Sequence, residues 1–393
     1  MMRPETLPGI DPATARAEID LAAFRRNLAA IREHVGDSML MVVVKADGYG
    51  HGMLACAREA RVAGADWLGV ATPAEALAVR DAGDTGPMLA WLYGPDEDLS
   101  DLVAADVDVS AQSLDQLTRL AAAAATAERR ARVHLKIDTG LSRNGASPQI
   151  WPDVCAAAAE GEAAGAFQVV GLWSHFAAAD EPGHPGTDRQ IDAFYDAEKV
   201  ARAAGLQPEL RHLSNSAGAL VVAQARLDMV RIGIAAYGID PAPGIAALAG
   251  VELRPVMTLR AQLVSVKELS PGDGVSYGWT WVADEATTVG LVPLGYADGI
   301  PRHAGNTARV GWRGGQAPVR GRICMDQFVV DLGPQAASVG DEVILFGAGD
   351  LGEPTAAQWA EWCGTIGYEI VTRIGTRVRR VFLNAGEFNA QAD

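Results

Sequence analysis

The sequence predicts an α/β fold, a (β/α)8 TIM-like barrel followed by a mostly β C-terminal domain. Strand-like runs alternate with alanine-rich helical stretches from about Ser38 to Gly238, which is typical of βα units. After Gly238, glycine and proline punctuate alternating strands and turns. The chain has 393 residues, too many for one typical core, and this length also indicates two domains.

The first part of the chain contains eight strand candidates. They are Leu40–Val44, Trp67–Ala71, Met88–Tyr93, Val107–Ser110, Val133–Ile137, Val169–Ser174, Glu209–Leu213 and Met229–Ile234. Helical patterning lies between them, as in Thr72–Ala82, Leu114–Ala127 and Asp188–Ala204. Eight such units predict a barrel. An open doubly wound sheet is the alternative, but it would more often carry a glycine-rich dinucleotide loop after its first strand, and this sequence has none there.

The second part of the chain follows a linker that contains Pro241, Pro243 and Gly244. Its strand candidates are Val256–Leu263, Val275–Tyr277, Thr287–Pro293, Ala308–Val310, Phe328–Asp331 and Glu342–Phe346, with one helix at about Thr355–Cys363. The short segment Ala17–Asp20 is a candidate strand for this sheet rather than for the barrel. We therefore divide the chain into an N-terminal tail (1–16), a barrel (17–245) and a β domain (246–393).

The charge balance is acidic, with 33 Lys and Arg against 49 Asp and Glu and a formal net charge of -16. Such a surface repels nucleic acid and anionic membranes, so we expect neither as a partner, and plain solubility accounts for the charge. Residues 1–15 lack the apolar segment of a signal peptide, and no charge-free run is long enough to span a bilayer. The four cysteines are widely scattered, with neither metal-type pairing nor a disulfide framework, so we expect a cytoplasmic protein.

Lys45 is the residue that points most directly to chemistry. It follows the apolar run Val42–Val44, and a loop with three glycines comes next. A lysine at the end of a parallel strand faces a cleft, where burial disfavours its charged form and leaves a nucleophilic amine of the kind that forms Schiff bases. A surface lysine that closes a βα unit is the plainer interpretation of this residue alone.

Other polar residues share this placement. Lys45, Arg143, His175, Ser216 and Arg231 each lie where a strand candidate ends. Because catalytic groups of a barrel gather where strands end and βα loops begin, we expect these side chains to surround one mouth.

Eight segments in order resemble alanine racemases over nearly the whole chain. They are Val43-Val-Lys-Ala-Asp-Gly-Tyr-Gly-His-Gly52, Lys136-Ile-Asp-Thr-Gly-Leu-Ser-Arg143, Trp173-Ser-His-Phe176, His212-Leu-Ser-Asn-Ser216, Arg231-Ile-Gly-Ile-Ala-Ala-Tyr-Gly238, Val275-Ser-Tyr-Gly278, Gly295-Tyr-Ala-Asp-Gly299 and Gly321-Arg-Ile-Cys-Met-Asp-Gln327. The resemblance implies a pyridoxal 5'-phosphate enzyme that interconverts L-alanine and D-alanine by a two-base mechanism and supplies D-alanine for peptidoglycan.

The resemblance implies two bases. Lys45 would carry the cofactor covalently and, once freed, act on one face of the substrate Cα, while Tyr277 would act on the other face. His175 and Arg231 would stand behind the tyrosine, and Arg231 would face the pyridine nitrogen. Taken alone, Tyr277 is more simply a half-buried strand tyrosine and Arg231 a structural ion-pair partner.

The remaining site residues are also implied by the resemblance. The cofactor phosphate would meet Tyr49, Ser216, Tyr368 and the backbone N–H groups of Gly233 and Ile234. The substrate carboxylate would meet Arg143 and the backbone N–H of Met325, with Lys136, Tyr296 and Asp326 in support. Lys136 matches a lysine that is carbamylated in some members. The family often has Met-Gly-Arg-Leu-Gly where this chain has Leu141-Ser-Arg-Asn-Gly145, so the arginine is kept but its flanks differ.

The resemblance further implies a head-to-tail homodimer in which Lys45 of one chain meets Tyr277 of the other. A racemase of broader specificity remains an alternative, as does a barrel-type pyridoxal-phosphate decarboxylase, although the decarboxylases use a glutamate at the pyridine nitrogen. A non-catalytic pyridoxal-phosphate carrier is disfavoured because such carriers are single barrels. A metal hydrolase built on His51, His134, His175, His184 and His212 is disfavoured because no pair of them has helical ligand spacing. We therefore expect no metal.

Overall fold

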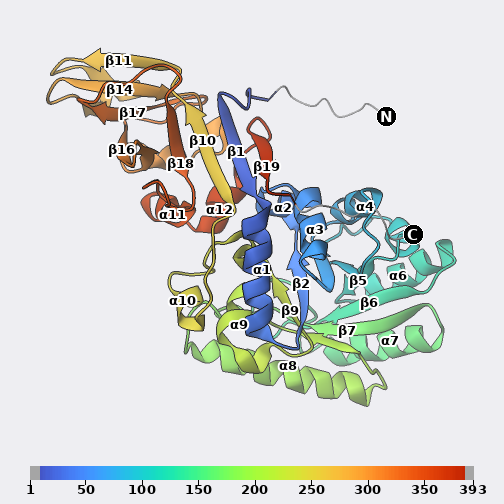
Figure 1. Ribbon diagram of the computed structural model, residues 1–393. Coiled ribbons are helices and arrows are strands. Elements are labelled where there is room, and N and C mark those ends of the chain that lie inside the picture. The colour runs from blue at the N-terminus through green and yellow to red at the C-terminus, as the bar shows by residue number, and fades with distance from the viewer. Residues whose placement is uncertain (1–8, 386–393) are drawn as a thin grey trace.

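Eight parallel strands form a barrel in one half of the protein (Figure 1). The computed structural model describes residues 9–385. Residues 1–8 of the predicted tail lie outside this range. The barrel strands are β2 (Met39–Val43), β3 (Trp67–Val70), β4 (Met88–Ala90), β5 (Asp108–Ala111), β6 (Ala131–Lys136), β7 (Phe167–Trp173), β8 (Leu210–His212) and β9 (Met229–Ile232). Each of the eight strands that the sequence predicts for the barrel is present.

The strand order of this sheet is β8-β7-β6-β5-β4-β3-β2-β9. Strand β2 pairs with both β3 and β9, so the first and last barrel strands are neighbours. Between β8 and β9, the backbone N–H of Arg231 donates to the Ser214 carbonyl at 3.0 Å. The sheet is therefore nearly closed, and the carboxyl ends of all its strands open on one mouth.

Helices surround the barrel and connect its strands. They are α1 (Leu21–Val35), α2 (Lys45–Tyr49), α3 (Met53–Val62), α4 (Pro73–Asp81), α5 (Ser100–Ala104), α6 (Leu114–Thr126), α7 (Trp151–Ala163), α8 (Pro185–Ala203), α9 (Ser216–Val221) and α10 (Ile245–Ala249), with short 3-10 turns η1 (Ala223–Ala225) and η2 (Ile234–Tyr237). The sequence analysis predicted α4, α6 and α8 but not α1. Helix α1 begins where the Asp20 carboxylate accepts hydrogen bonds from the Ala22 and Ala23 N–H groups.

The rest of the chain forms a mostly β unit around a nine-stranded sheet of order β11-β14-β17-β16-β15-β18-β10-β1-β19. Its elements are β1 (Ala15–Asp20), β10 (Met257–Gln262), β11 (Ser265–Leu269), β14 (Thr287–Val292), β15 (Arg309–Trp312), β16 (Gly315–Arg320), β17 (Phe328–Gly333), β18 (Glu342–Phe346) and β19 (Arg379–Leu383), with the separate pair β12 (Gly274–Val275) and β13 (Trp281–Val282), helices α11 (Ala356–Cys363) and α12 (Gly367–Thr372), and turns η3 (Tyr277–Trp279), η4 (Tyr296–Asp298) and η5 (Arg302–Ala304).

Strand β1 ties the N-terminal part of the chain to this sheet. It pairs antiparallel with β10, with Ala15 opposite Ala261, and parallel with β19. Figure 1 shows the three strands side by side, with α1 running from β1 down the side of the barrel. The strand expected at Ala17–Asp20 is therefore present and lies in the β sheet.

One prediction about the β unit is wrong in detail. The sequence suggests a strand through Val275–Tyr277, but β12 ends at Val275, and Tyr277 begins the turn η3. Ser276 has φ 62° and Gly278 has φ 72°, both in the left-handed region, so the backbone cannot continue as a strand. Tyr277 consequently projects from a tight turn rather than from a pleated surface.

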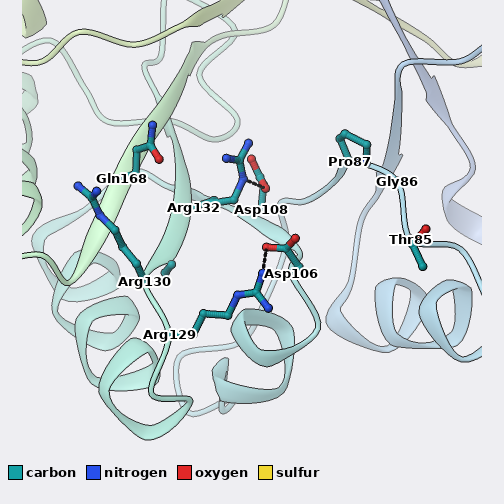
Figure 2. Close-up of a pocket in the computed structure, with 10 residues that line it drawn as sticks. Thr85, Gly86, Pro87, Asp106, Asp108, Arg129, Arg130, Arg132 and Gln168 are labelled. Carbon is teal, nitrogen blue, oxygen red and sulfur yellow. Dashed lines mark hydrogen bonds and ion pairs between the residues drawn. The ribbon is translucent and has the colours of Figure 1, made fainter.

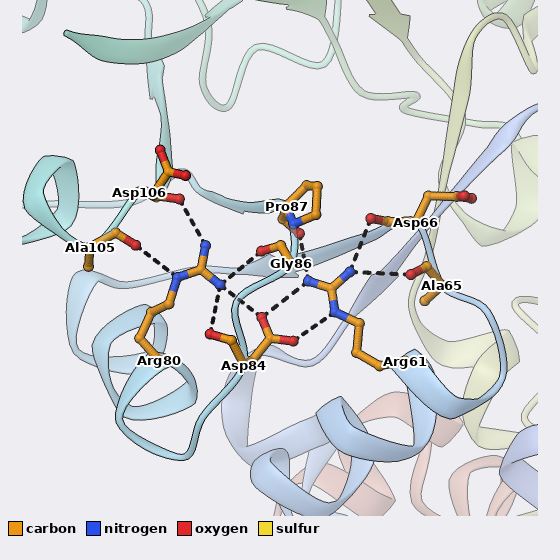
Figure 3. Close-up of polar contacts among 9 residues, drawn as sticks. All are labelled: Arg61, Ala65, Asp66, Arg80, Asp84, Gly86, Pro87, Ala105 and Asp106. Carbon is orange, nitrogen blue, oxygen red and sulfur yellow. Dashed lines mark hydrogen bonds and ion pairs between the residues drawn. The ribbon is translucent and has the colours of Figure 1, made fainter. Parts of the chain in front are cut away.

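An ion network binds loops at the amino-terminal face of the barrel (Figure 3). The Asp84 carboxylate accepts from Arg61 Nε at 2.7 Å and from Arg80 Nη1 at 2.8 Å. Arg61 also donates to the backbone carbonyl of Pro87, and Arg80 to that of Ala105. All three charged side chains are largely buried, so Asp84 balances two guanidinium groups that position loops before neighbouring strands.

Replacing Asp84 by alanine should lower the apparent free energy of unfolding by about 2 kcal/mol, because two largely buried guanidinium groups lose their counter-ion. Urea unfolding followed by circular dichroism measures the change. Asp196→Ala is the matched control, since Asp196 pairs with Lys199 on an exposed surface and its loss should cost less than about 0.5 kcal/mol. Equal losses in the two variants would contradict a structural role for the Asp84 network.

Candidate active site

A cavity of about 490 Å³ lies at the mouth where the barrel strands end. It is lined by ten of the residues that the sequence analysis assigned to binding or catalysis. They are Lys45, Tyr49, Lys136, Arg143, His175, Ser216, Arg231, Gly233, Ile234 and Tyr368. Residues separated by more than 300 positions in the sequence therefore converge on one cavity, as expected for a barrel active site.

Lys45 stands at the end of β2 on an unusual turn. Ala46, Asp47 and Gly48 have φ values of 52°, 53° and 61°, so the chain turns through left-handed conformations directly after the lysine. The Ala46 N–H donates to the Glu75 carboxylate at 2.7 Å, which fixes the turn. Burial and the nearby charge of Arg143 lower the pKa of Lys45. The turn therefore holds a lysine of which a larger fraction is neutral than of a surface lysine at the same pH.

Arg231 is buried beneath the cavity and held by acceptors on several sides. Its guanidinium donates to the backbone carbonyls of Ser174 at 2.7 Å, His212 at 2.9 Å and Leu213 at 3.0 Å. It also contacts the Trp173 ring, 4.9 Å from the centroid. Burial and the charge of Arg143 lower the pKa of Arg231 to about 9, so the group remains a cation and a pure donor at neutral pH.

His175 lies against Arg231 and remains neutral. Its Nδ1 is 3.3 Å from Arg231 Nη2, and an arginine can only donate, so Nδ1 accepts. Burial and the charge of Arg231 place the pKa of His175 well below its ordinary value. The imidazole therefore carries its proton on Nε2.

The cavity has a strong excess of positive charge. Lys45, Lys136, Arg143 and Arg231 line it, while none of the described lining residues is an Asp or Glu. Burial, together with Arg231 and Arg143, lowers the pKa of Lys136 to about 7, and its Nζ lies 3.9 Å from the Trp173 ring centroid. Such a site favours anionic groups, for example a phosphate or a carboxylate.

One end of the cavity has the groups to hold a phosphate. The Gly233 N–H donates to Ser216 Oγ at 2.9 Å, and a Cβ at position 233 would lie 2.3 Å from Tyr49 Oη. Only glycine therefore lets the tyrosine approach the backbone here. Burial raises the pKa of Tyr49 and of Tyr368, so both hydroxyls stay protonated and can donate.

Four predicted site residues do not line the cavity. Tyr277, Tyr296, Met325 and Asp326 lie on the β unit, where the Tyr277 side chain is 69% exposed and Met325 is 54% exposed. Their loops are joined, because the Tyr296 N–H donates to the Cys324 carbonyl and Ser276 Oγ donates to the Arg322 carbonyl. We call these four residues the exposed loop cluster. Asp326 within it accepts from Arg377 at 2.7 Å.

The structure adds residues that the sequence analysis did not assign. Trp173 underlies both Arg231 and Lys136, and Trp91 lines the cavity with its ring 5.8 Å from Lys45 Nζ. Asn144 also lines it, and among the described residues its buried Oδ1 has no hydrogen-bond partner. A tryptophan at a strand end, directly before Ser174 and His175, was the available signal for Trp173.

Within residues 9–385, no cluster of three His, Cys, Asp or Glu side chains is arranged to hold a metal ion. Over the same residues, no helix has the length and apolar character needed to cross a membrane. All four cysteines, which lie in this part of the chain, are free thiols.

Two family models match the chain. The alanine racemase N-terminal domain matches residues 19–241, and the alanine racemase C-terminal domain matches residues 256–382. Among curated proteins, an alanine racemase of Frankia casuarinae is 52% identical over 93% of this chain and 96% of its own length. One of Streptomyces coelicolor is 51% identical over 94% of this chain and 96% of its own length.

Solved structures agree with these matches. A crystal structure of the alanine racemase from D-cycloserine-producing Streptomyces lavendulae has a TM-score of 0.94 and 48% identity, covering 97% of this chain and 100% of that one. The alanine racemase structure of Streptomyces coelicolor A3(2) has a TM-score of 0.92 and 51% identity, covering 95% and 98%. The barrel, the β unit and the sequence all lead to one conclusion: this chain belongs to the alanine racemase family.

Proposed function

We propose that this protein is a pyridoxal 5'-phosphate-dependent racemase that interconverts L-alanine and D-alanine with two bases. The observation that carries the proposal is the buried Arg231, a donor-only cation fixed beneath the same cavity that Lys45 lines. D-alanine made in this way would supply peptidoglycan, and we place the enzyme in the cytoplasm.

The residues present fit the cofactor. The cavity combines a lysine of lowered pKa, an unpartnered buried acceptor on Asn144, and the close approach of Tyr49 to Gly233. Ser216, Tyr49, Tyr368 and the N–H groups of Gly233 and Ile234 would hold the phosphate, Lys45 would bind the aldehyde carbon, and Arg231 would face the pyridine nitrogen. When bound, pyridoxal phosphate draws electrons from the substrate Cα and makes its proton easier to remove.

Lys45 and Tyr277 would move the proton. The lowered pKa of Lys45 favours a neutral amine that can take or return a proton on one face of Cα. Arg143 would hold the substrate carboxylate through a two-donor contact, together with the backbone N–H of Met325. Behind Tyr277, His175 would donate its Nε2 proton to the phenol oxygen, and Arg231 would act through His175 by donating to its Nδ1.

The second base would reach the cavity from another chain. Tyr277 is exposed on the β unit and does not line the cavity of its own chain, and the adjacent Trp279 is 71% exposed. Large exposed aromatic side chains beside Met325 are typical of a surface that another protein covers. We infer a head-to-tail homodimer in which the exposed loop cluster completes the cavity of the other copy.

Arg231 also separates the proposed reaction from its alternatives. An arginine keeps its protons at neutral pH, so Arg231 would donate a hydrogen bond to the pyridine nitrogen without giving it a proton. A barrel-type decarboxylase would place a glutamate there, which favours the racemase. A racemase of broader specificity uses the same groups and remains the second candidate.

Lys45→Ala should lower kcat for racemisation in both directions by more than about a thousandfold, because the cofactor attachment and one base are lost together. Polarimetry measures the rate, and the absorption band of the bound cofactor should disappear. Lys199→Ala, which removes an exposed lysine, should leave both unchanged. Substantial activity in Lys45→Ala without added amines would contradict the assignment.

Mixed dimers test whether active sites are shared. Lys45→Ala and Tyr277→Phe subunits should each be inactive, and mixing them should restore activity because a heterodimer contains one cavity with both bases intact. The measurement is racemase activity after subunit exchange, verified by mass spectrometry of differently tagged chains. Exchanged but inactive mixtures would show that both residues act within one chain.

Lys136 should be carbamylated. With a pKa of about 7, its amine is largely neutral above pH 7 and can react with carbon dioxide, whereas protonation below pH 7 blocks the reaction. The product is an anion, which relieves repulsion from Arg143 and Arg231. A carbamate signal should appear by ¹³C NMR with labelled bicarbonate at pH 8 and fade by pH 6, and Lys136→Met should lack it. A signal of equal strength in Lys136→Met would assign the carbamate elsewhere.

A further inference from the structure

Four buried polar side chains form a continuous chain of hydrogen bonds across the barrel interior. Arg231 Nη1 is 3.1 Å from His212 Nδ1, His212 Nε2 is 2.9 Å from His134 Nδ1, and His134 Nε2 is 3.0 Å from an Asp108 carboxylate oxygen. The residues come from β9, β8, β6 and β5, and none is more than 4% exposed. Of these four residues, only Arg231 has a role in the proposed reaction.

The direction of every hydrogen bond in this chain follows from its arginine end. Arg231 can only donate, so His212 Nδ1 accepts. Burial and the charge of Arg231 keep the pKa of His212 well below its ordinary value, so this neutral ring carries its proton on Nε2. That proton is donated to His134 Nδ1, which leaves His134 with its proton on Nε2, directed at the carboxylate.

Asp108 lies at the far end, beside a second cavity of about 570 Å³ on the amino-terminal side of the barrel (Figure 2). Its other carboxylate oxygen accepts from Arg132 Nε at 2.7 Å. Asp106 lines the same cavity and pairs with Arg129. Of these two aspartates, Asp108 is the one whose carboxylate meets His134 and so connects this face of the barrel to the hydrogen-bonded series that ends at Arg231.

Aromatic side chains fix the planes of the two imidazoles. The His212 ring stacks on Trp173 with an interplanar angle of 7°, and the His134 ring meets Trp67 edge to face. Packing at this density prevents the rings from leaving their planes but does not choose which nitrogen carries the proton. The donor-only Arg231 at one end and the Asp108 carboxylate at the other make that choice together.

We propose that Asp108 is a positioning residue for Arg231, acting through His134 and His212. Its carboxylate accepts the His134 Nε2 proton and so keeps both imidazoles in the tautomer that offers an acceptor to Arg231. In the opposite tautomer, a His212 Nδ1 proton would face the Arg231 Nη1 protons, and the guanidinium would lose one of its anchors. The expected effect on catalysis rests on the proposed function of Arg231, whereas the expected tautomers of His134 and His212 do not depend on that function.

The tautomers can be read directly by ¹⁵N NMR of the holoenzyme labelled at histidine, with signals assigned from His134→Gln and His212→Gln. In the unsubstituted protein, both rings should show a protonated Nε2 and a bare Nδ1. A protonated Nδ1 on either ring would overturn the proposal. If both rings show the expected tautomers but the protein has no racemase activity, the proposed function is refuted, whereas the assignment of these four hydrogen-bonded residues stands.

Three variants then separate positioning from stability. Asp108→Leu removes the acceptor, so protonated Nδ1 signals should appear and kcat should fall about tenfold at unchanged cofactor content. Asp108→Asn can keep its one carbonyl oxygen on His134 Nε2 while its NH2 group turns toward Arg132, which loses its acceptor there, so the tautomers should be kept, with kcat within about threefold of the original. Asp106→Asn, the matched control beside the same cavity, should change neither.

Unchanged tautomers and kcat in folded Asp108→Leu would overturn the proposal. If Asp108→Leu does not fold, Asp108→Ala takes its place because it also removes the acceptor: protonated Nδ1 signals with a lower kcat support positioning by the acceptor, and unchanged tautomers and kcat contradict it.

Discussion

The burial of one positive charge is the constraint on which the active-site half of this protein depends. Arg231 lies almost fully buried inside a barrel, where an unsolvated cation is costly unless acceptors surround it. Three backbone carbonyls at the ends of β7 and β8 and two imidazole nitrogens, of His212 and His175, supply those acceptors. The strand ends must therefore keep a fixed geometry, which also fixes the shape of the cavity above them.

The same charge organises its neighbours. Burial, together with the charge of Arg231, lowers the pKa values of Lys136 and Lys45 and keeps His175 and His212 neutral. A cluster of cations without a carboxylate in the lining is unfavourable by itself, and it becomes favourable when an anionic ligand enters. The same cluster of positive charges thus makes the empty cavity electrostatically unfavourable and gives it affinity for a phosphate and a carboxylate.

The β unit is held in a fixed position on the barrel by the N-terminal strand β1. Strand β1 lies in the nine-stranded sheet between β10 and β19, and α1 follows it directly onto the barrel. Both ends of the described chain are therefore held in one sheet, which fixes the β unit relative to the barrel. Its exposed loop cluster does not line the cavity of its own chain, which leaves Tyr277 available to the second copy that we propose.

The sequence by itself determined the eight barrel strands, the mostly β second half, and the residues that gather at one mouth. This was possible because period-two and apolar patterns are local, and because strand ends in a barrel share one face whatever the side chains. Local patterns also placed Lys45, Arg143 and Ser216 at those ends.

Only the tertiary structure decided which groups touch. It showed Trp173 beneath Arg231 and Lys136, the chain from Arg231 through His212 and His134 to Asp108, and Tyr277 on a turn rather than a strand. These contacts join residues far apart in the sequence, so no local pattern encodes them. The histidines looked like weak metal ligands in the sequence because a ligand and a hydrogen-bond partner use the same nitrogen atoms, and only the neighbouring side chains distinguish the two roles.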